Sequence, residues 1–244
     1  RRRYRPLHHG SETLNTLILK LVGHCNLACV YCYDYDDERY ALKLPLEMAR
    51  KAITQALERC GKNLRVLFHG GEPLLAFDEL RSLVAHARQV AEAQGKRVGF
   101  AVQTNGTRFS NDVVRFLLDE EIRVGISLDG PPETNDALRK DHHGRGRSDQ
   151  IERTLRIYPE LRARLGVLTT VTRLNAGRLI DVATYVRDLG VERWDMTLLD
   201  AVGRASYGCG DLMPAVGDIV RSFHELLDAV EAGQFDRASP RRFA

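Results

Sequence analysis

Long apolar runs are absent from this chain of 244 residues. No stretch of 18 or more apolar residues occurs, so no segment is expected to cross a membrane as a helix. The start of the chain also contains no apolar stretch of the kind that a secretory signal has. The formal net charge is only +3, which is too weak a balance to indicate a nucleic-acid-binding surface. We therefore expect a cytoplasmic protein that binds neither membranes nor nucleic acid.

Internal repeats and low-complexity segments are also missing, which argues against a solenoid or a long disordered tract. Hydrophobic residues make up 43% of the chain and the mean hydropathy is −0.30, as in an ordinary globular protein with a sizeable core. The one local excess of charge is the run Arg-Arg-Arg-Tyr-Arg at residues 1–5. We interpret residues 1–15 as a basic N-terminal segment, either a disordered tail or an arm that attracts an acidic peptide.

Cysteine is scarce, yet three of the five cysteines, Cys25, Cys29 and Cys32, lie close together. Cysteines so near each other in one loop cannot all pair in disulfides, and without an export signal they are typical of metal or cluster ligands. Three thiolates can bind three irons of a cubane and leave the fourth iron open, which is what distinguishes a reactive metal site from a closed one. The alternative is a structural zinc site in a binding module, with His24 or Cys60 as fourth ligand. Zinc sites of that kind usually pair two Cys-x-x-Cys units, and no second unit is present.

Short β-branched or apolar runs alternate with longer amphipathic segments along most of the chain. The predicted strands are residues 16–22, 64–68, 97–104, 122–128, 165–172 and 192–199. The predicted helices are residues 46–59, 79–94, 111–120, 150–164, 178–189 and 214–232. Repeated β-α units imply a parallel sheet with right-handed crossovers, and six units suit a partial barrel better than a complete eight-fold one. We predict an α/β fold, a partial (β/α)6 TIM-like barrel over residues 16–205, followed by a helical segment over residues 206–244.

A glycine-rich turn follows the second predicted strand, with the residues Gly70, Gly71, Glu72 and Pro73. Two glycines let the backbone approach a ligand closely, and Pro73 fixes the exit of the turn. Glu72 is a carboxylate beside backbone amides, and it is suited to receive a ligand ammonium group. The alternative is a plain strand–helix turn that binds nothing.

Polar side chains also end the third and fourth predicted strands. Gln103 and Asn105 share one strand parity, and so do Ser127 and Asp129, so each pair is expected to face the barrel interior. Polar groups at the carboxyl ends of barrel strands are what a ribose or carboxylate ligand requires, and solvated strand ends are the alternative. The segment 131–148 that follows is long, basic and glycine-containing, and we predict that it forms a mobile lid over the barrel mouth.

The spacing Cys-x3-Cys-x2-Cys, with the aromatic residue Tyr31 before the last cysteine, resembles the radical S-adenosylmethionine (radical SAM) superfamily. The motifs Gly-Gly-Glu-Pro, Gln-Thr-Asn-Gly and Ser-Leu-Asp-Gly follow in the order found in that superfamily, so the resemblance runs from about Leu17 to about Ala205. More narrowly, the segment Cys-Asn-Leu-Ala-Cys-Val-Tyr-Cys-Tyr is similar to the branch that includes SPASM-type peptide-modifying enzymes and anaerobic sulfatase maturases.

The resemblance implies a [4Fe–4S] cluster on the three clustered cysteines and S-adenosylmethionine bound at the Gly-Gly-Glu-Pro turn. It also implies that the four polar strand-end residues line the pocket for this cosubstrate and the substrate, with Ser127 and Asp129 near the ribose. By the same resemblance Val171 and Thr172 meet the adenosine, and Leu198 and Leu199 supply an apolar contact to the adenine. A place in the hydrophobic core is the alternative for all four of these residues.

The activity that the resemblance implies is reductive cleavage of S-adenosylmethionine and abstraction of substrate hydrogen by a 5′-deoxyadenosyl radical. An open six-unit barrel admits an extended chain, so we expect a ribosomal peptide whose side chain is crosslinked or oxidised. The alternative is a maturase that oxidises a residue of a folded protein such as a sulfatase. The expected redox partner is a one-electron donor such as flavodoxin or ferredoxin.

The chain departs from the SPASM-type pattern after the barrel. Enzymes of that type carry a cysteine-rich extension with auxiliary clusters, whereas Cys209 is the one cysteine that follows residue 205. Ligation of an auxiliary cluster by Cys209 is an open alternative. We expect residues 206–244 to be the start of a truncated or missing extension, and we assign no catalytic acid or base.

Overall fold

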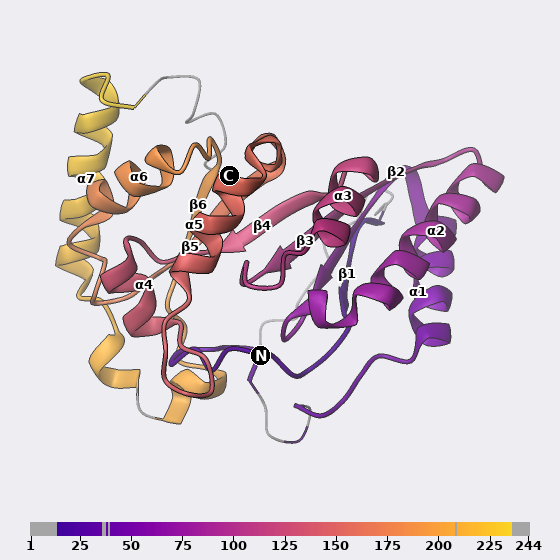
Figure 1. Ribbon diagram of the computed structural model, residues 1–244, viewed down its shortest axis with the longest axis horizontal. Helices are drawn as coiled ribbons and strands as arrows, with labels where there is room; N and C mark the ends of the chain where they lie inside the picture. Colours follow the sequence, from indigo (N-terminus) through magenta and orange to yellow (C-terminus); the bar gives the residue numbers. More distant parts are fainter. Residues whose placement is uncertain (1–13, 36–37, 39, 208, 236–244) are drawn as a thin grey trace, which may run out of the picture.

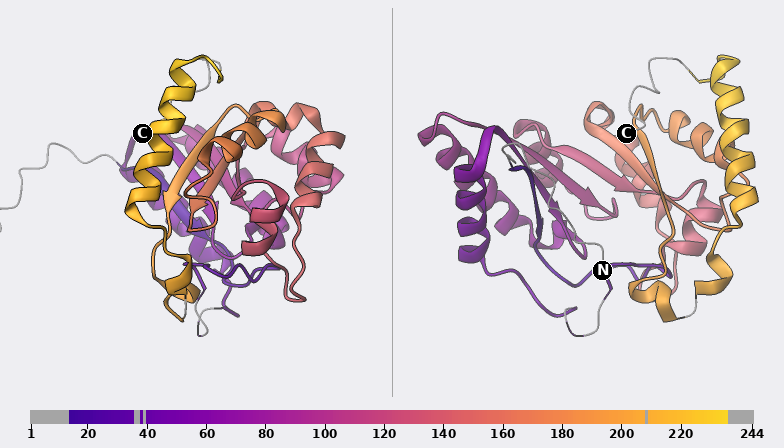
Figure 2. Two further views of the ribbon diagram at one scale, coloured as in Figure 1. Left: turned by 90° about the vertical axis from the view of Figure 1, so that its left-hand side faces the viewer. Right: turned by 180° about the vertical axis from the view of Figure 1, so that it is seen from behind.

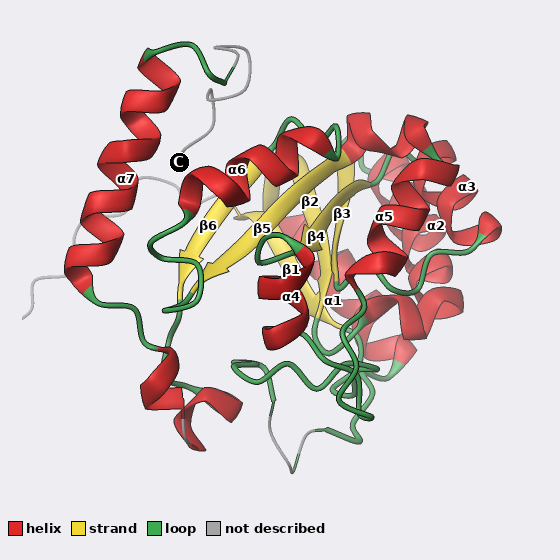
Figure 3. Ribbon diagram, turned by 60° about the vertical axis from the view of Figure 1, so that its left-hand side comes forward, coloured by secondary structure: helices red, strands yellow, loops and turns green. Residues whose placement is uncertain are grey.

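Six parallel strands form one sheet in the computed structural model, which describes residues 14–35, 38, 40–207 and 209–235. The strands are β1 (Leu14–Lys20), β2 (Cys60–His69), β3 (Arg97–Thr104), β4 (Arg123–Ser127), β5 (Leu165–Val171) and β6 (Trp194–Leu198). They lie side by side in chain order, and every neighbouring pair is parallel. The sheet is curled (Figure 3), so the predicted partial barrel is confirmed. The basic run at residues 1–5 lies outside the described residues.

Helices connect the strands and cover the outer, convex face of the sheet (Figures 1 and 2). The α-helices are α1 (Leu46–Arg59), α2 (Phe77–Ala93), α3 (Asn111–Asp119), α4 (Pro132–Leu138), α5 (Ser148–Ile157), α6 (Leu179–Asp188) and α7 (Val216–Glu231). The 3-10 turns are η1 (Pro73–Ala76), η2 (Pro159–Arg164), η3 (Gly203–Tyr207) and η4 (Cys209–Leu212). Pro73 opens η1 directly after the Gly-Gly turn, as the sequence predicts. No helix within the described ranges is both long and apolar enough to cross a membrane.

The hydrophobic core lies between the sheet and the helices on its outer face. On β2, Leu64, Val66 and Phe68 are buried in this core, and the residues between them face the opposite side. The same alternation of buried and more exposed positions holds on β4 and β5. The inner, concave face is therefore open in the part of the chain that the structure describes, with half-buried or exposed residues along β2, β3 and β4.

The segment 131–148 is a packed element rather than a loose lid. It contains α4, which starts at a proline and buries three of its seven residues. Arg139 and Asp141, directly after the helix, are 9% and 8% exposed. Two of its charged side chains, Arg139 and Asp141, make their hydrogen bonds inside the protein, whereas residues 142–145 are exposed.

Candidate active site

The three clustered cysteines lie on the loop 23–34, here called the cysteine loop, at the carboxyl end of the sheet. This is the end of a parallel barrel at which active sites are built. Ala28 N donates to the carbonyl of Lys140 at 2.7 Å, and Val30 N donates to the carbonyl of Leu138 at 3.0 Å. On its other side, the loop accepts a hydrogen bond from Arg204 N at the carbonyl of Cys32, at 2.8 Å. The loop is thus held by the exit of α4 and by η3.

All three thiols are free of disulfides; Cys29 is buried, and Cys25 and Cys32 are half-buried. Burial raises the pKa of Cys25 to about 12 and that of Cys29 to about 11. Each of these two pKa values is raised further by the charge of the next cysteine along the loop. Iron binds the thiolate form and offsets this cost of ionisation. Three free thiols on one loop are a donor set that fits an iron–sulfur cluster.

Cys60 cannot join these cysteines in a zinc site. It begins β2, whereas the cysteine loop lies beyond the other end of that strand, roughly 30 Å away at the usual rise per residue. Its thiol is buried and donates to the carbonyl of Leu57 at 3.3 Å. Within the described ranges, no three His, Cys, Asp or Glu side chains converge closely enough to hold a single metal ion. A cubane needs no such convergence, because each cysteine binds a different iron.

The Gly-Gly turn after β2 packs directly on the cysteine loop. Gly70 and Gly71 have φ angles of 84° and 36°, which favour glycine. A Cβ on Gly71 would lie 2.0 Å from the carbonyl oxygen of His24, and one on Gly70 would lie 2.8 Å from the Cβ of Lys20. The amide of Glu72 donates to the same His24 oxygen at 3.1 Å. The close contact between two stretches of this chain therefore requires both glycines, whatever ligand the turn binds.

Glu72 is fully buried and joins the exits of β2 and β3. Its carboxylate accepts hydrogen bonds from Leu74 N at 3.0 Å, Thr104 Oγ1 at 2.8 Å and Asn105 N at 2.8 Å. Burial raises the pKa of Glu72, and these three donors oppose the rise. The carboxylate thus has a role within the chain, and its contact with a ligand ammonium group stays a prediction.

Asn105 supports the cysteine loop from the exit of β3. Its Nδ2 donates to Asn26 Oδ1 at 3.0 Å and to Cys25 Sγ at 3.5 Å. Its Oδ1 accepts from the backbone and hydroxyl of Thr107, and Asn26 Nδ2 donates to the same hydroxyl at 2.8 Å. Leu27 N is a second donor to Cys25 Sγ, at 3.4 Å. Donors to a ligating sulfur tune the reduction potential of a cluster, so Asn105 and Leu27 are placed to do this.

Gln103 and Ser127 meet on the inner face of the sheet, as their strand parity predicts. Gln103 Nε2 donates to Ser127 Oγ at 2.9 Å. Gly125 lies opposite Gln103 on β4, and a Cβ there would come within 2.1 Å of Gln103 Oε1. Both polar residues are half-buried, so they offer an amide and a hydroxyl to a ligand at the carboxyl end of the inner face.

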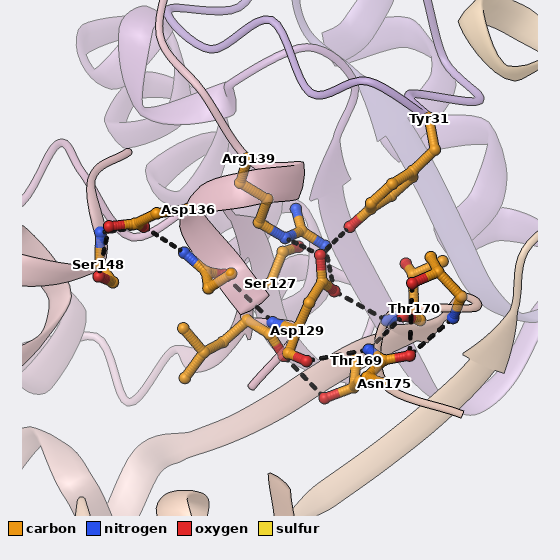
Figure 4. A network of polar contacts seen from close by, with 12 residues as sticks. Tyr31, Ser127, Asp129, Asp136, Arg139, Ser148, Thr169, Thr170 and Asn175 are labelled. Carbon is orange, nitrogen blue, oxygen red and sulfur yellow. Dashed lines mark hydrogen bonds and ion pairs between the residues drawn. The ribbon is translucent and has the colours of Figure 1, made fainter. Parts of the chain in front are cut away.

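Asp129 lies at the centre of a buried polar network (Figure 4). Arg139 donates to both carboxylate oxygens, from Nε to Oδ2 at 2.9 Å and from Nη2 to Oδ1 at 3.1 Å. The Tyr31 hydroxyl is a second donor to Oδ2, and Thr170 N is a second donor to Oδ1 at 3.0 Å. Two donors on each oxygen use the acceptor capacity of the group. The structure therefore places Asp129 inside the protein, and not on the open ligand-facing wall implied by the resemblance.

This network joins the cysteine loop, the exit of α4 and the strand β5. The Arg139 guanidinium also lies over the Tyr31 ring, 5.3 Å from its centre. Burial raises the pKa of Tyr31 well above its ordinary value; Arg139 opposes the rise and Asp129 adds to it, so the hydroxyl stays protonated and donates. Asn175 Nδ2 donates to the carbonyls of Asp129 and Thr170 at 2.9 and 3.0 Å. The position of the cysteine loop is thus coupled to elements far from it in the sequence.

Val171 and Leu198 pair with each other across β5 and β6, and their contacts with the adenosine and adenine stay predictions. Val171 is fully buried in a cluster with Leu179 of α6, the core position that was its alternative. Leu198 is 55% exposed. Leu199, one residue further on, is the one that packs with Tyr31 of the cysteine loop.

Several residues of the site belong to no motif that the sequence patterns single out. Asn26 lies between two cysteines and looks like any loop asparagine until its bonds to Asn105 and Thr107 are seen. Arg139 belongs to a basic stretch whose composition suggests a solvated loop. His142 Nε2 lies 2.9 Å from the carbonyl oxygen of Cys25. The one available signal for Arg139 was an unpaired Asp129 at a predicted strand end, which needs a cation when it is buried.

A parallel half-barrel with three free cysteines on the loop after its first strand defines the class of this protein. The chain belongs to the Radical SAM superfamily, whose family model matches residues 19–186. That superfamily uses a [4Fe–4S] cluster and S-adenosylmethionine, the two cofactors that the sequence predicts. Membership of this superfamily argues against the alternative hypothesis, a zinc-stabilised binding module.

The relatives of this chain include enzymes that mature sulfatases. It is similar to the cysteine-type anaerobic sulfatase-maturating enzyme of Clostridium novyi (strain NT), with 29% identity over 176 residues, 70% of this chain and 46% of that protein. The solved structure of native anSMEcpe with bound AdoMet and Cp18Cys peptide matches with a TM-score of 0.69 and 25% identity, over 77% of this chain and 51% of the other.

The fold is also that of SuiB from Streptococcus suis. Its structure bound to S-adenosylmethionine matches with a TM-score of 0.68 and 17% identity, over 92% of this chain and 49% of the other. The chain spans about half the length of these relatives, from 46% to 51%.

Proposed function

We propose that this chain is the cluster-binding barrel of an enzyme that crosslinks or oxidises a side chain of a ribosomal peptide. The three clustered cysteines hold the cluster, and S-adenosylmethionine binds beside it, at the Gly-Gly-Glu-Pro turn and near Gln103, Asn105 and Ser127. When bound, the cluster and S-adenosylmethionine supply an electron and a 5′-deoxyadenosyl radical that takes hydrogen from the substrate. The electron comes from a small donor protein such as flavodoxin or ferredoxin.

The observation that carries this proposal is the fixed position of the three free thiols. The cysteine loop is bonded to the exit of α4, to η3 and to the Gly-Gly turn, and Asn105 and Leu27 donate to Cys25 Sγ. A loop held from several directions presents its sulfurs with little rearrangement, which is what a preorganised cofactor site requires. The buried Asp129–Arg139 pair stabilises the same loop through Tyr31.

Two observations favour a peptide as substrate. The inner face of the half-barrel is open along the strands in the described part of the chain, which suits an extended chain better than a compact molecule. The anSMEcpe structure, a match at 25% identity, holds AdoMet and a peptide together.

The second candidate is a maturase that oxidises a cysteine or serine of a sulfatase. It is favoured by the similarity to the sulfatase-maturating enzyme of Clostridium novyi. Both candidates use the same cysteine loop, so they differ in the substrate and not in the site described here.

The test of the proposed function uses the full-length protein, purified and reconstituted without oxygen, with S-adenosylmethionine and a chemical reductant. We expect the wild type to form 5′-deoxyadenosine, measured by liquid chromatography, and Cys29→Ala to form none. The matched control is Cys60→Ala, which removes a buried thiol at the far end of β2 and is expected to keep the activity. Cleavage of S-adenosylmethionine by Cys29→Ala at the wild-type rate would overturn the cluster assignment.

The two substrates are told apart by mass spectrometry after turnover. One set of reactions contains peptides encoded by small reading frames beside the gene, and the other contains peptides that carry the modified cysteine or serine of a sulfatase. A mass change confined to the first set supports peptide maturation. A change confined to the second set supports the sulfatase maturase.

A further inference from the structure

Three arginines gather at the amino-terminal rim of the inner face, at the opposite end of the strands from the cysteine loop. Arg65 of β2, Arg97 of β3 and Arg123 of β4 line one hollow of about 600 Å³. The strand register brings them together. On β3, Gly99 and Ala101 follow Arg97 on the same face of the sheet. Arg65 of β2 pairs with Gly99, and Arg123 of β4 pairs with Ala101. All three arginines are exposed.

The charge of these arginines is not balanced by the described part of the chain. None of the three is in an ion pair with a described residue, and Arg97 Nε donates to the neutral Asn63 Oδ1 at 2.8 Å. Glu121 also lines the hollow, but its carboxylate is paired with Arg164 at 3.0 Å. The fork of a guanidinium group matches a carboxylate, so the hollow is suited to carboxylate ligands.

The inner face of the sheet continues from this hollow toward the cysteine loop. Ala101 and Gly125 are the small, half-buried residues between the two, and the Gln103 side chain lies over Gly125. At Gly99 an added Cβ would meet nothing within 4 Å, so the space above the sheet is open there. From Arg65 to His69, at the end of β2 beside the Gly-Gly turn, the strand rises by about 13 Å, and an extended peptide covers that distance with about four residues.

We propose that the three-arginine hollow binds a carboxylate side chain of the peptide substrate, about four residues from the residue that is modified. This inference rests on the proposed function and narrows its substrate to peptides with an aspartate or glutamate at that spacing. The occupant is therefore an acidic stretch of the peptide substrate.

The binding test uses the full-length protein and two labelled peptides of eight residues. One peptide has two adjacent glutamates in a glycine–serine background, and the other has glutamines in their place. We expect fluorescence anisotropy to show binding of the acidic peptide, at least about tenfold weaker binding of the neutral one, and loss of the difference at high salt. Equal binding of the two peptides, or no binding of either, overturns the inference; the latter is the result if the rest of the chain fills the hollow.

Variants then assign the binding to this hollow. The double substitution Arg65→Gln with Arg123→Gln is expected to weaken binding of the acidic peptide about tenfold. The matched control is Arg115→Gln with Arg153→Gln, two exposed arginines on α3 and α5, which changes the net charge equally and is expected to leave binding unchanged. An equal loss in both double variants means attraction to net charge alone and overturns the inference.

Formation of 5′-deoxyadenosine by the wild type is measured in parallel. If it occurs without any preference for the acidic peptide, the carboxylate site fails while the proposed function stands. If the preference is present and follows Arg65 and Arg123 but no 5′-deoxyadenosine forms, the proposed function fails and the carboxylate site stands.

Discussion

Replacing Arg139 by methionine removes the buried partner of Asp129 and keeps an unbranched side chain in its place. Arg139 is 9% exposed and Asp129 is fully buried. Burial by itself lowers the pKa of Arg139, but the charge of Asp129 raises it above the ordinary value, so the wild-type residue is a cation. In the variant, Asp129 loses two of its four donors and keeps those from Tyr31 and Thr170. A buried carboxylate is then left without a counter-charge.

The expected size of the effect follows from that geometry. Removing one partner of a buried ion pair costs about 3–5 kcal/mol of unfolding free energy. Because methionine still packs on the Tyr31 ring and two donors remain, we expect about 3 kcal/mol for Arg139→Met. Asp129→Asn leaves the buried Arg139 without a counter-charge instead, and it is expected to cost a similar amount of unfolding free energy. The double variant leaves no unpaired charge, so its cost is expected to stay near about 3 kcal/mol rather than the sum of about 6 kcal/mol.

The assay is urea unfolding followed by the fluorescence of Trp194, the single tryptophan of the chain, which lies on β6 and donates to Thr169 Oγ1. Arg115→Met, at an exposed position of α3, is the control and is expected to stay within about 0.5 kcal/mol of the wild type. Two results would refute the coupling of this pair. One is a cost below about 1 kcal/mol for Arg139→Met, and the other is a double variant whose cost equals the sum of the two single costs to within about 0.5 kcal/mol.

Three further outcomes follow from the site. Gly71→Ala places a Cβ 2.0 Å from a carbonyl oxygen of the cysteine loop, so its iron content after reconstitution should be lost, whereas Gly144→Ala, at φ 77° with open space around it, should keep its iron. Asn105→Ala removes a donor to a ligating sulfur, so the midpoint potential in an EPR-monitored titration should become more negative; an unchanged potential argues against that bond. Burial lowers the pKa of His69, and protonation would remove the Nδ1 acceptor of Gly70 N. The pKa of His69 is therefore lower in the folded than in the unfolded protein, and the unfolded chain binds the proton more readily. The unfolding free energy should fall as the pH drops below about 6.5. His69→Asn should make this dependence flatter between about pH 7.5 and about pH 5.5. An equal slope of unfolding free energy against pH in the wild type and in His69→Asn contradicts this assignment to His69.

The sheet was predictable because its strands are buried on one face and follow one another in space. The predicted strands and the observed β1 to β6 differ at most by a few residues, and the largest difference is at β2, which begins at Cys60 instead of residue 64. The additional residues are mostly exposed at the rim of the sheet, so they carry no apolar signal. The helix α4 was missed for a related reason, since two of its three buried residues, Thr134 and Asn135, are polar.

The cysteine loop was predictable because its signal is local, a spacing within one loop. The environment of Asp129 was not, because β4 ends at Ser127 and strand alternation no longer sets the direction of a side chain two residues later. Its partners Arg139, Thr170 and Tyr31 come from three separate parts of the chain, and no local pattern links them. Local spacing thus predicts the cysteines that bind the cluster. The residues that hold the cysteine loop in position are known only from the tertiary contacts.

The most direct test of the central claim, that the cysteine loop carries a [4Fe–4S] cluster with one iron open to S-adenosylmethionine, is EPR spectroscopy of the reduced, anaerobically reconstituted full-length protein. We expect an iron–sulfur signal whose shape changes when S-adenosylmethionine is added, and no such signal in Cys29→Ala. A wild-type protein without an iron–sulfur signal, or with a signal that S-adenosylmethionine leaves unchanged, would contradict the claim.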